Sequence, residues 1–396
     1  MTRALLLIPS VVKDDIESEV AADRHPAMDY HVLAAALRTR AGMDVDVLDY
    51  AAADADTSPG VRLARRLGGR DAALAAMALA RRGGYDVVFS NGENVGVPLA
   101  LLLGVLPHRL GHVTIGHRLS TPKKRLFFQV LRAQRRLDKI FVYALAQHDW
   151  AVDRLGIEPE KLSLIPFHAD DRFYRPLPLP VNPDQVCSVG REGRDYPTLL
   201  EAVAGMPDLT LKLTTASPWS RRRDETQGRA LPPNVDTGRY DYPGLRALYA
   251  ASLCAAVPLY DTDFQAGITT VLEAMAMGKA VVATRTAGLA DVISDGENGL
   301  LVAPGDVEGW RTAITRLRAD PALRERLGRS ARRWVEENAT LDRWAARLAD
   351  ALAGAAERQP RQKYFESPSE NEPNGMNYAG KENVDDVQSL RPCVRE

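Results

Sequence analysis

The chain alternates short apolar runs with amphipathic stretches, in two series separated by a proline-rich segment. Short apolar runs between helical patterns are typical of parallel strands that helices cover on both faces. The first series of strand-like runs lies near residues 4, 45, 86, 113 and 140, and the second begins near residues 186, 209, 254, 279 and 299. The alternation therefore predicts two doubly wound, Rossmann-like α/β units.

The prolines between residues 176 and 183 indicate a linker. We expect a first domain over 1–175, a second over 176–340, and a helix over 341–358 that returns to the first domain. The segment 359–396 is polar and rich in Pro, Asn and Ser, so we expect it to be disordered. Open parallel sheets bind ligands at the carboxyl ends of their strands, and a cleft between the two domains is the expected site.

Composition narrows the classes of function. The formal net charge of -1 gives no overall attraction to nucleic acid, and we expect no nucleic-acid partner. Three cysteines, Cys187, Cys254 and Cys393, fit neither a disulfide framework nor a zinc pattern. No leader-like start and no apolar run of membrane-spanning length is visible. We therefore expect a cytoplasmic protein that is soluble or peripheral at a membrane.

One stretch, QAGITTVLEAMAMG at residues 265–278, combines a glycine turn with a helix start. The first amides of a helix lack intrahelical partners, and such a start binds anions, phosphate in particular. Glu273 lies one turn further along the same helix, where its carboxylate could accept hydrogen bonds from a ribose. A glutamate that caps or pairs locally remains the alternative.

These residues resemble the retaining nucleotide-sugar glycosyltransferases of family 4, which have the GT-B fold of two Rossmann-like domains facing across a cleft. That family carries two glutamates eight positions apart before Ala-Met-Ala, a glycine and an apolar strand. Glu273 matches the second glutamate, which binds the ribose, and Gln265 stands at the first, which contacts the donor sugar. A glutamine can hydrogen-bond a hydroxyl, but it brings no charge to a developing oxocarbenium ion.

The resemblance extends over residues 140–320 and implies a complete donor site. Arg191 and Arg194 stand where the family clamps the donor diphosphate, and guanidinium groups bind phosphate oxygens in pairs. The segment from Gly238 to Tyr240 stands where the backbone meets the base. The residues expected to bind the donor are Gly190, Arg191, Arg194, Gly238, Tyr240, Gln265, Gly267, Ile268, Thr269, Thr270 and Glu273.

The first domain is expected to supply the acceptor site and a catalytic histidine. His117 ends a strand where the family often places a histidine near the donor sugar, so we group it with Arg191, Arg194 and Gln265 as catalytic residues. A structural role for this histidine stays open. Candidate acceptor-binding residues are His25, Asn91 and Glu93. Glu93 could equally serve as the negative charge at the start of a helix.

Two further features bear on partners. Asp261 and Asp263 form an Asp-x-Asp pair, which binds a divalent metal in another glycosyltransferase architecture; the doubly wound pattern favours arginines and a helix terminus instead, so we expect no metal and no cofactor. Residues 118–139 are basic, and the pattern over 123–137 predicts an amphipathic helix whose apolar face contains Leu126, Phe127, Val130 and Leu131. This segment could contact an anionic membrane surface, or its apolar face could pack on the sheet.

The resemblance implies a metal-independent hexosyltransferase that moves a sugar from a nucleoside diphosphate sugar to a small-molecule or glycan acceptor with retention of configuration. Two alternatives remain open at this point. One is a GT-B relative that acts as a sugar-nucleotide epimerase or a phosphorylase. The other is a nucleotide-binding protein without transferase activity. This alternative stays open because Gln265 stands where the family has a glutamate.

Overall fold

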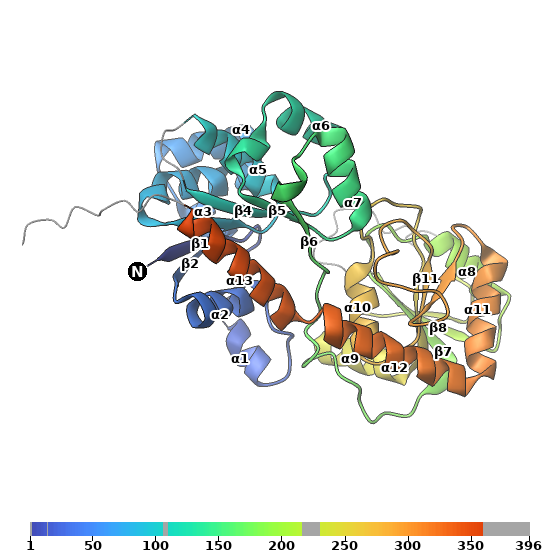
Figure 1. Ribbon diagram of the computed structural model, residues 1–396. Coiled ribbons are helices and arrows are strands. Elements are labelled where there is room, and N and C mark those ends of the chain that lie inside the picture. The colour runs from blue at the N-terminus through green and yellow to red at the C-terminus, as the bar shows by residue number, and fades with distance from the viewer. Residues whose placement is uncertain (1, 14, 106–109, 216–229, 359–396) are drawn as a thin grey trace, which may run out of the picture. The chain divides into compact units, whose positions relative to one another are not determined.

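The structure is a computed structural model that describes residues 2–13, 15–105, 110–215 and 230–358. These residues contain two parallel sheets, each with helices on both faces, as Figure 1 shows. Each sheet has six strands, and every strand pairing within them is parallel. The predicted class of two Rossmann-like parallel-sheet units is therefore confirmed. The segment 359–396, which we expected to be disordered, lies outside the described residues.

The first sheet has the strand order β2-β1-β3-β4-β5-β6. Its strands are β1 Arg3–Leu7, β2 Asp44–Leu48, β3 Val87–Ser90, β4 Gly111–Gly116, β5 Lys139–Val142 and β6 Leu162–Leu164. The accompanying α-helices are α1 Ile16–Ala21, α2 Asp29–Ala41, α3 Tyr50–Ala55, α4 Pro59–Arg81, α5 Glu93–Gly104, α6 Pro122–Arg125 and α7 Leu145–Trp150. The strand order reverses between β1 and β3, and such a switch point is where open sheets bind ligands.

The second sheet has the order β12-β11-β10-β7-β8-β9 and reverses between β7 and β10. Its strands are β7 Asn182–Val189, β8 Thr210–Thr214, β9 Val235–Thr237, β10 Ser252–Val257, β11 Val281–Thr284 and β12 Leu300–Val302. Its helices are α8 Tyr196–Ala204, α9 Tyr242–Ala251, α10 Ile268–Ala276, α11 Val307–Ala319 and α12 Pro321–Asn338. The central strand β10 is buried along its whole length, which explains its unbroken apolar sequence.

The last described helix, α13 (Leu341–Glu357), packs on α2 and on the first sheet, as the red helix in Figure 1 shows. Leu348 and Leu352 are fully buried there, in the same apolar cluster as Leu33 and Leu37 of α2. Where the chain returns from the second sheet, the amide of Leu341 donates to Ala169 O at 3.0 Å. The amide of Ala169 in turn donates to Ala339 O, so the two chain crossings between the sheets are paired with each other.

The segment 123–137 does not form the continuous amphipathic helix that we expected. After α6, residues Leu126–Val130 form a π-helical turn, and Arg132 has a left-handed φ of 52° before a 3-10 turn. Phe128 takes the buried position, whereas Leu126, Val130 and Leu131 are exposed. The alternative that the apolar face packs on the sheet is therefore wrong for Leu126, Val130 and Leu131.

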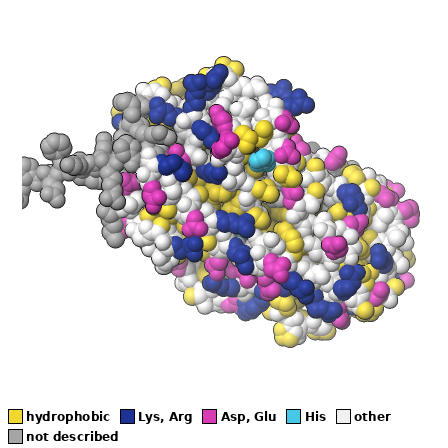
Figure 2. All heavy atoms as spheres, viewed as in Figure 1, with side chains coloured by type: hydrophobic (Ala, Val, Ile, Leu, Met, Phe, Trp, Pro, Cys, Tyr) yellow, Lys and Arg dark blue, Asp and Glu magenta, His cyan; other side chains and the backbone are white. Residues whose placement is uncertain are grey.

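Surface charge is mixed. On the face shown in Figure 2, acidic and basic side chains are interspersed between apolar and neutral ones. None of the helices in the described ranges combines the length and the apolar character needed to cross a membrane.

Candidate functional site

The loops that follow β7 and β10 meet at the switch point of the second sheet. Gly190, with φ 101°, directly follows β7, and Gly267, with φ 75°, is the N-cap of α10. A Cβ on Gly190 would lie 2.5 Å from Nη2 of Arg194, and one on Gly267 would lie 2.8 Å from Nη1. Both positions therefore need glycine, because a side chain would displace the guanidinium that lies between the two loops.

Arg194 joins these loops. Its Nε and Nη2 donate to Val189 O at 3.1 and 2.7 Å, and Nη1 donates to Glu192 O at 3.0 Å. Nη2 also donates to Thr270 Oγ1 at 2.9 Å, in the first turn of α10. The side chain is 4% exposed, so the guanidinium places a buried positive charge beside the start of this helix. The nitrogens of Arg194 donate to acceptors of the protein itself. Arg194 would therefore favour a bound anion through its positive charge and by fixing the shape of the loop.

Arg191 lies in the same loop with a freer guanidinium. It is partly exposed, and its one hydrogen bond among the described residues runs from Nε to Thr215 O at 3.0 Å. Within the described part of the chain the terminal nitrogens have no acceptor. Among the described residues no side chain caps the start of α10, so the amides of Ile268, Thr269 and Thr270 have no side-chain acceptor there. An uncapped helix start beside arginines attracts a negatively charged group.

The carboxyl of Glu273 lies one turn further along α10, and the residue is 9% exposed. Oε2 accepts a hydrogen bond from the Tyr249 hydroxyl at 2.8 Å. Burial raises the pKa of Glu273 to about 7, against the opposite effects of Tyr249, Tyr174 and Arg194. Sequence reasoning found Glu273 but neither of the two tyrosines, because nothing in the spacing of 174, 249 and 273 shows that they meet.

An aromatic surface lies near the end of β9. Tyr240 is 39% exposed, and its ring lies against Gly238, where a Cβ would come within 3.1 Å of the ring carbons. The amide of Gly238 donates to Leu213 O, which fixes the loop on β8. A half-exposed phenol ring on a fixed loop offers a face on which a planar base can stack.

Gln265 extends to the end of the first sheet. Its Nε2 donates to Tyr143 O, just after β5, at 2.9 Å, and its Oε1 is buried without a hydrogen-bond partner among the described residues. A glutamate could not make this bond, because a carboxylate has no N–H and would face the carbonyl oxygen. The contact gives a physical reason for the amide at this position.

At the switch point of the first sheet, Glu93 is engaged within the chain. Its Oε2 accepts from the His117 amide at 2.8 Å, and its Oε1 accepts from Lys124 Nζ at 2.6 Å and from the Arg118 amide at 3.3 Å. Burial opposes ionisation, but Lys124 and His117 outweigh it and lower the pKa of Glu93. Glu93 is also the first residue of α5, so its geometry fits a structural charge at a helix start.

Asn91 donates from Nδ2 to Asp29 Oδ2 at 3.0 Å, which joins the loop after β3 to the start of α2. Asp29 was not singled out from the sequence; the only signal was an acid at the start of the α2 pattern. The imidazole of His117 is exposed and lies 5.4 Å from the ring of Tyr143. These polar groups lie at the carboxyl ends of neighbouring strands.

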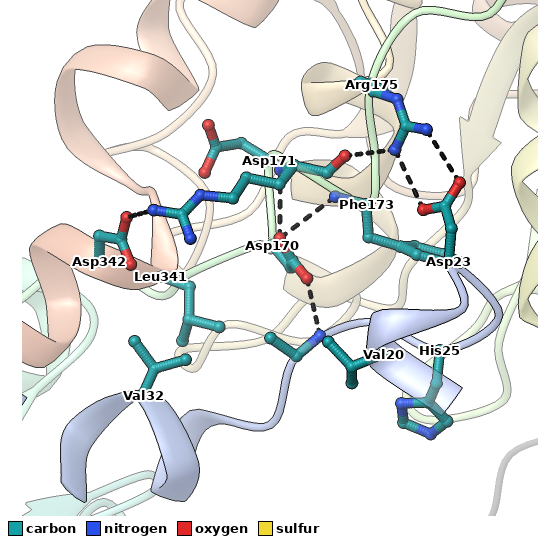
Figure 3. Close-up of a pocket in the computed structure, with 12 residues that line it drawn as sticks. Val20, Asp23, His25, Val32, Asp170, Asp171, Phe173, Arg175, Leu341 and Asp342 are labelled. Atoms are coloured by element: carbon teal, nitrogen blue, oxygen red, sulfur yellow. Dashed lines mark hydrogen bonds and ion pairs between the residues drawn. The ribbon is translucent and has the colours of Figure 1, made fainter. Parts of the chain in front are cut away.

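His25 lies elsewhere, in a pocket of about 240 Å³ that Figure 3 shows. Asn91 and Glu93 are not among the residues that line it. The His25 ring packs edge-on against Tyr242 with centroids 4.3 Å apart. The structure therefore does not bring the three expected acceptor residues together.

The pocket contains an ion-pair clasp centred on Asp23. In Figure 3 this carboxylate faces Arg175, and it also accepts from both terminal nitrogens of Arg246 on α9 at 2.9 Å. Arg246 is 8% exposed and donates further to Phe173 O. Hydrogen bonds from Arg246 and Arg175 hold the pKa of Asp23 well below its usual value. The clasp fixes the loop after β1 against the linker and α9.

Comparisons with known proteins give one family match and several similar proteins. Residues 186–320, which include all of the expected donor residues, match the family described as glycosyl transferases group 1. The lipopolysaccharide core biosynthesis glycosyltransferase LpsE of Rhizobium meliloti is 35% identical over 154 residues, which are 38% of this chain and 44% of that protein. A D-inositol 3-phosphate glycosyltransferase of Acidothermus cellulolyticus is 28% identical over 299 residues, 66% of this chain and 65% of that protein. The chain thus matches about half to two thirds of the length of these curated relatives.

Solved structures show the same fold at low identity. The sucrose-phosphate synthase of Thermosynechococcus elongatus superposes with a TM-score of 0.67 at 20% identity, covering 88% of this chain and 98% of that one. Anabaena Alr3699/HepE in complex with UDP-glucose gives 0.66 at 18% identity, covering 89% and 100%. With the two parallel sheets described above, these neighbours identify the fold as GT-B.

The clasp gives a prediction about stability. Asp23→Asn should lower the free energy of unfolding by about 1 to 2 kcal/mol at neutral pH, since a buried arginine loses its carboxylate. The value is modest because the Asp23 side chain is 44% exposed and screened by solvent. A carboxyl with a depressed folded pKa stabilises above its unfolded pKa of about 3.9, so the difference should vanish as the pH falls through that value and below.

Urea unfolding at neutral and at acidic pH measures this difference. Asp44→Asn is the matched control, because Asp44 is an exposed acid of the same domain that forms no ion pair with another described residue. Equal midpoints for the two variants at neutral pH would show that the clasp contributes nothing.

Proposed function

We propose that this protein is a glycosyltransferase that moves a sugar from a nucleoside diphosphate sugar to a hydroxyl acceptor, without a metal ion and with retention of anomeric configuration. The observation that carries the proposal is the convergence of Gly190, Arg194, Gly267 and Thr270 at the switch point of the second sheet. This convergence lies inside the segment that matches the group 1 glycosyl transferases.

In the proposed donor complex the diphosphate lies at the start of α10. The amides of Ile268 to Thr270 and the terminal nitrogens of Arg191 donate to phosphate oxygens, and Arg194 adds a buried positive charge. Tyr240 stacks on the base, and Glu273 accepts hydrogen bonds from the ribose hydroxyls. Donors that are fixed before the reaction stabilise charge at the leaving group without reorganisation.

The reaction breaks the bond between the anomeric carbon and the diphosphate oxygen and forms a bond from that carbon to the acceptor oxygen. The acceptor proton passes to the departing phosphate oxygen on the same face of the sugar. This front-face course, which the resemblance to family 4 implies, needs no protein nucleophile. Gln265, held by its bond to Tyr143 O, and His117 are proposed to contact the transferred sugar.

For the acceptor we propose a small polyol or glycan, bound at the carboxyl ends of the first sheet by His117, Asn91 and the neighbouring Asp29. D-inositol 3-phosphate and the lipopolysaccharide core, named in the descriptions of the similar proteins, are both rich in hydroxyl groups. Glu93 is proposed to hold the loop that carries His117. His25, in a separate pocket, is proposed to stabilise that pocket.

A panel of UDP, GDP, TDP and ADP sugars tests the proposal. The matching nucleotide sugar should raise the melting temperature, because a ligand at about a hundred times its Kd adds about 2.7 kcal/mol to the stability of the folded state. With that donor and candidate acceptors, product NMR should show a new glycosidic bond with the donor's anomeric configuration. Inverted product, an epimerised donor or a sugar phosphate would overturn the proposal, and binding without turnover would favour the silent relative.

Replacing Arg191 and replacing Arg194 should have different effects on activity and on stability. Arg191→Ala should lower kcat/KM by the equivalent of about 2 to 4 kcal/mol of transition-state stabilisation, the loss expected for one preorganised donor to developing charge. It should leave the unfolding midpoint unchanged. Arg194→Ala should lower kcat/KM as well and also destabilise the fold, because buried carbonyls lose their donor. Steady-state kinetics and urea unfolding measure both, with exposed Arg62→Ala as the control. Wild-type turnover in Arg191→Ala would remove this residue from the site.

We also propose that residues 118–139 contact an anionic membrane surface. Leu126, Val130 and Leu131 are 52%, 67% and 49% exposed, and basic residues at 123, 125 and 132 lie between or beside them. Exposed apolar side chains with flanking cations are the features that bind an amphipathic segment to anionic lipid. Lys124 is held by Glu93 and would not take part.

Sedimentation with phosphatidylglycerol vesicles tests this contact. Replacing Leu126, Val130 and Leu131 together by Ser should abolish binding, and wild-type binding should weaken with salt. The control replaces Leu63 and Leu67, which are exposed leucines on α4, by Ser. Equal binding of both variants would assign membrane contact to another surface.

A further inference from the structure

We propose that Tyr249 and Tyr174 are positioning residues that orient the Glu273 carboxyl toward the ribose of the donor, and that donor binding therefore releases a proton from Glu273 near neutral pH. The inference rests on the proposed function, because it assigns regulation to the same donor site.

The geometry encloses one carboxyl between two tyrosines from different elements. Tyr249 of α9 is fully buried and donates its hydroxyl to Glu273 Oε2 at 2.8 Å. Tyr174 comes from the linker before β7, is 2% exposed, and has its ring centroid 6.4 Å from that of Tyr249. Burial, and then the neighbouring Glu273 carboxylate, raises the pKa of the Tyr174 phenol.

The Tyr174 hydroxyl has no hydrogen-bond partner within the described part of the chain. A buried hydroxyl without a partner costs free energy, and a small movement toward the ionised carboxyl or toward a bound hydroxyl removes that cost. With Tyr249 it can hold the carboxyl from the core side, which leaves the exposed 9% of Glu273 for a ligand. Neither tyrosine needs to touch the ribose for this role.

Glu273 is the group in this cluster that changes charge near neutral pH. Burial raises its pKa to about 7. The groups that face it are Tyr249 and Tyr242 from α9, Tyr174 from the linker and Arg194 from the loop after β7. Burial raises the pKa of all three tyrosines, and that of the nearby Cys187 thiol to about 11, so these groups stay neutral between about pH 6 and about pH 8.5.

The sign of the effect follows from the hydrogen bonds. Ribose hydroxyls donate to the carboxylate and favour its charged form, so the pKa of Glu273 falls when the donor binds. Below about pH 7 binding then releases a proton, and affinity rises with pH until Glu273 is ionised in the free protein. Removing a tyrosine hydroxyl removes a donor to the carboxylate, which raises the pKa of Glu273 further and moves the midpoint to higher pH.

Isothermal titration calorimetry with the nucleotide sugar that the panel identifies tests the inference. A nucleotide sugar is the suitable probe, because both of its phosphates are esterified and neither takes up a proton near neutral pH. Measurements in two buffers of different ionisation enthalpy give the number of protons released. We expect release of close to one proton at about pH 6, none at about pH 8.5, and a roughly tenfold gain in affinity between about pH 6 and about pH 8.

Three variants separate positioning from mere packing. Tyr249→Phe and Tyr174→Phe should move the midpoint to higher pH, and Glu273→Gln should bind weakly with no pH dependence. Tyr85→Phe is the matched control, since it removes a tyrosine hydroxyl from another carboxylate, Asp46, at 2.9 Å on the first sheet. A purely structural role would lower affinity equally at every pH.

Wild-type binding without proton release, or unchanged midpoints in both phenylalanine variants, would overturn the inference alone. Pronounced pH dependence in Glu273→Gln would also overturn it, because another group would then titrate. Failure of every nucleotide sugar to bind at any pH would overturn the proposed function and this inference together, so the two failures are distinguishable.

Discussion

The buried guanidinium of Arg194 is the interaction on which the candidate donor site depends. It satisfies carbonyls of the loop after β7 and a hydroxyl of α10 at once, and it lies between two glycines whose left-handed φ values let the backbone approach it. Because a buried cation is costly without acceptors, the loop and the helix start must stay where they are. The free amides of α10 and the end of Arg191 are thereby held in place before any ligand arrives.

The sequence predicted the fold class well, because buried parallel strands give unbroken apolar runs between helical patterns. It missed β6 and β9, which are only three residues long and lie at the edges of their sheets, where few apolar residues are needed. It also predicted one helix over 123–137 from its periodicity. Instead Phe128 is buried and a π-helical turn forms, and three of the four expected apolar residues, Leu126, Val130 and Leu131, are exposed.

For the site, sequence reasoning succeeded where function is tied to a local pattern. Gly267 and the start of α10 follow from a glycine before a helical period, and the structure has that helix start. It could not predict partners that come together only through tertiary packing. Examples are the bond from Gln265 to Tyr143 O, the engagement of Glu93 by Lys124, and the tyrosines around Glu273. Spacing along the chain has no information about such contacts.

The pairing of Ala169 with Ala339 and Leu341 has a consequence for biosynthesis. It makes the second sheet an insertion within the first domain, since α13 completes the apolar cluster that contains Leu33 and Leu37. When residues 1–175 have left the ribosome, the helix that covers this part of the first sheet has therefore not yet been synthesised. The nascent amino-terminal half keeps an apolar surface open until α13 emerges, and its exposure to chaperones or to aggregation depends on how fast the intervening sheet is translated.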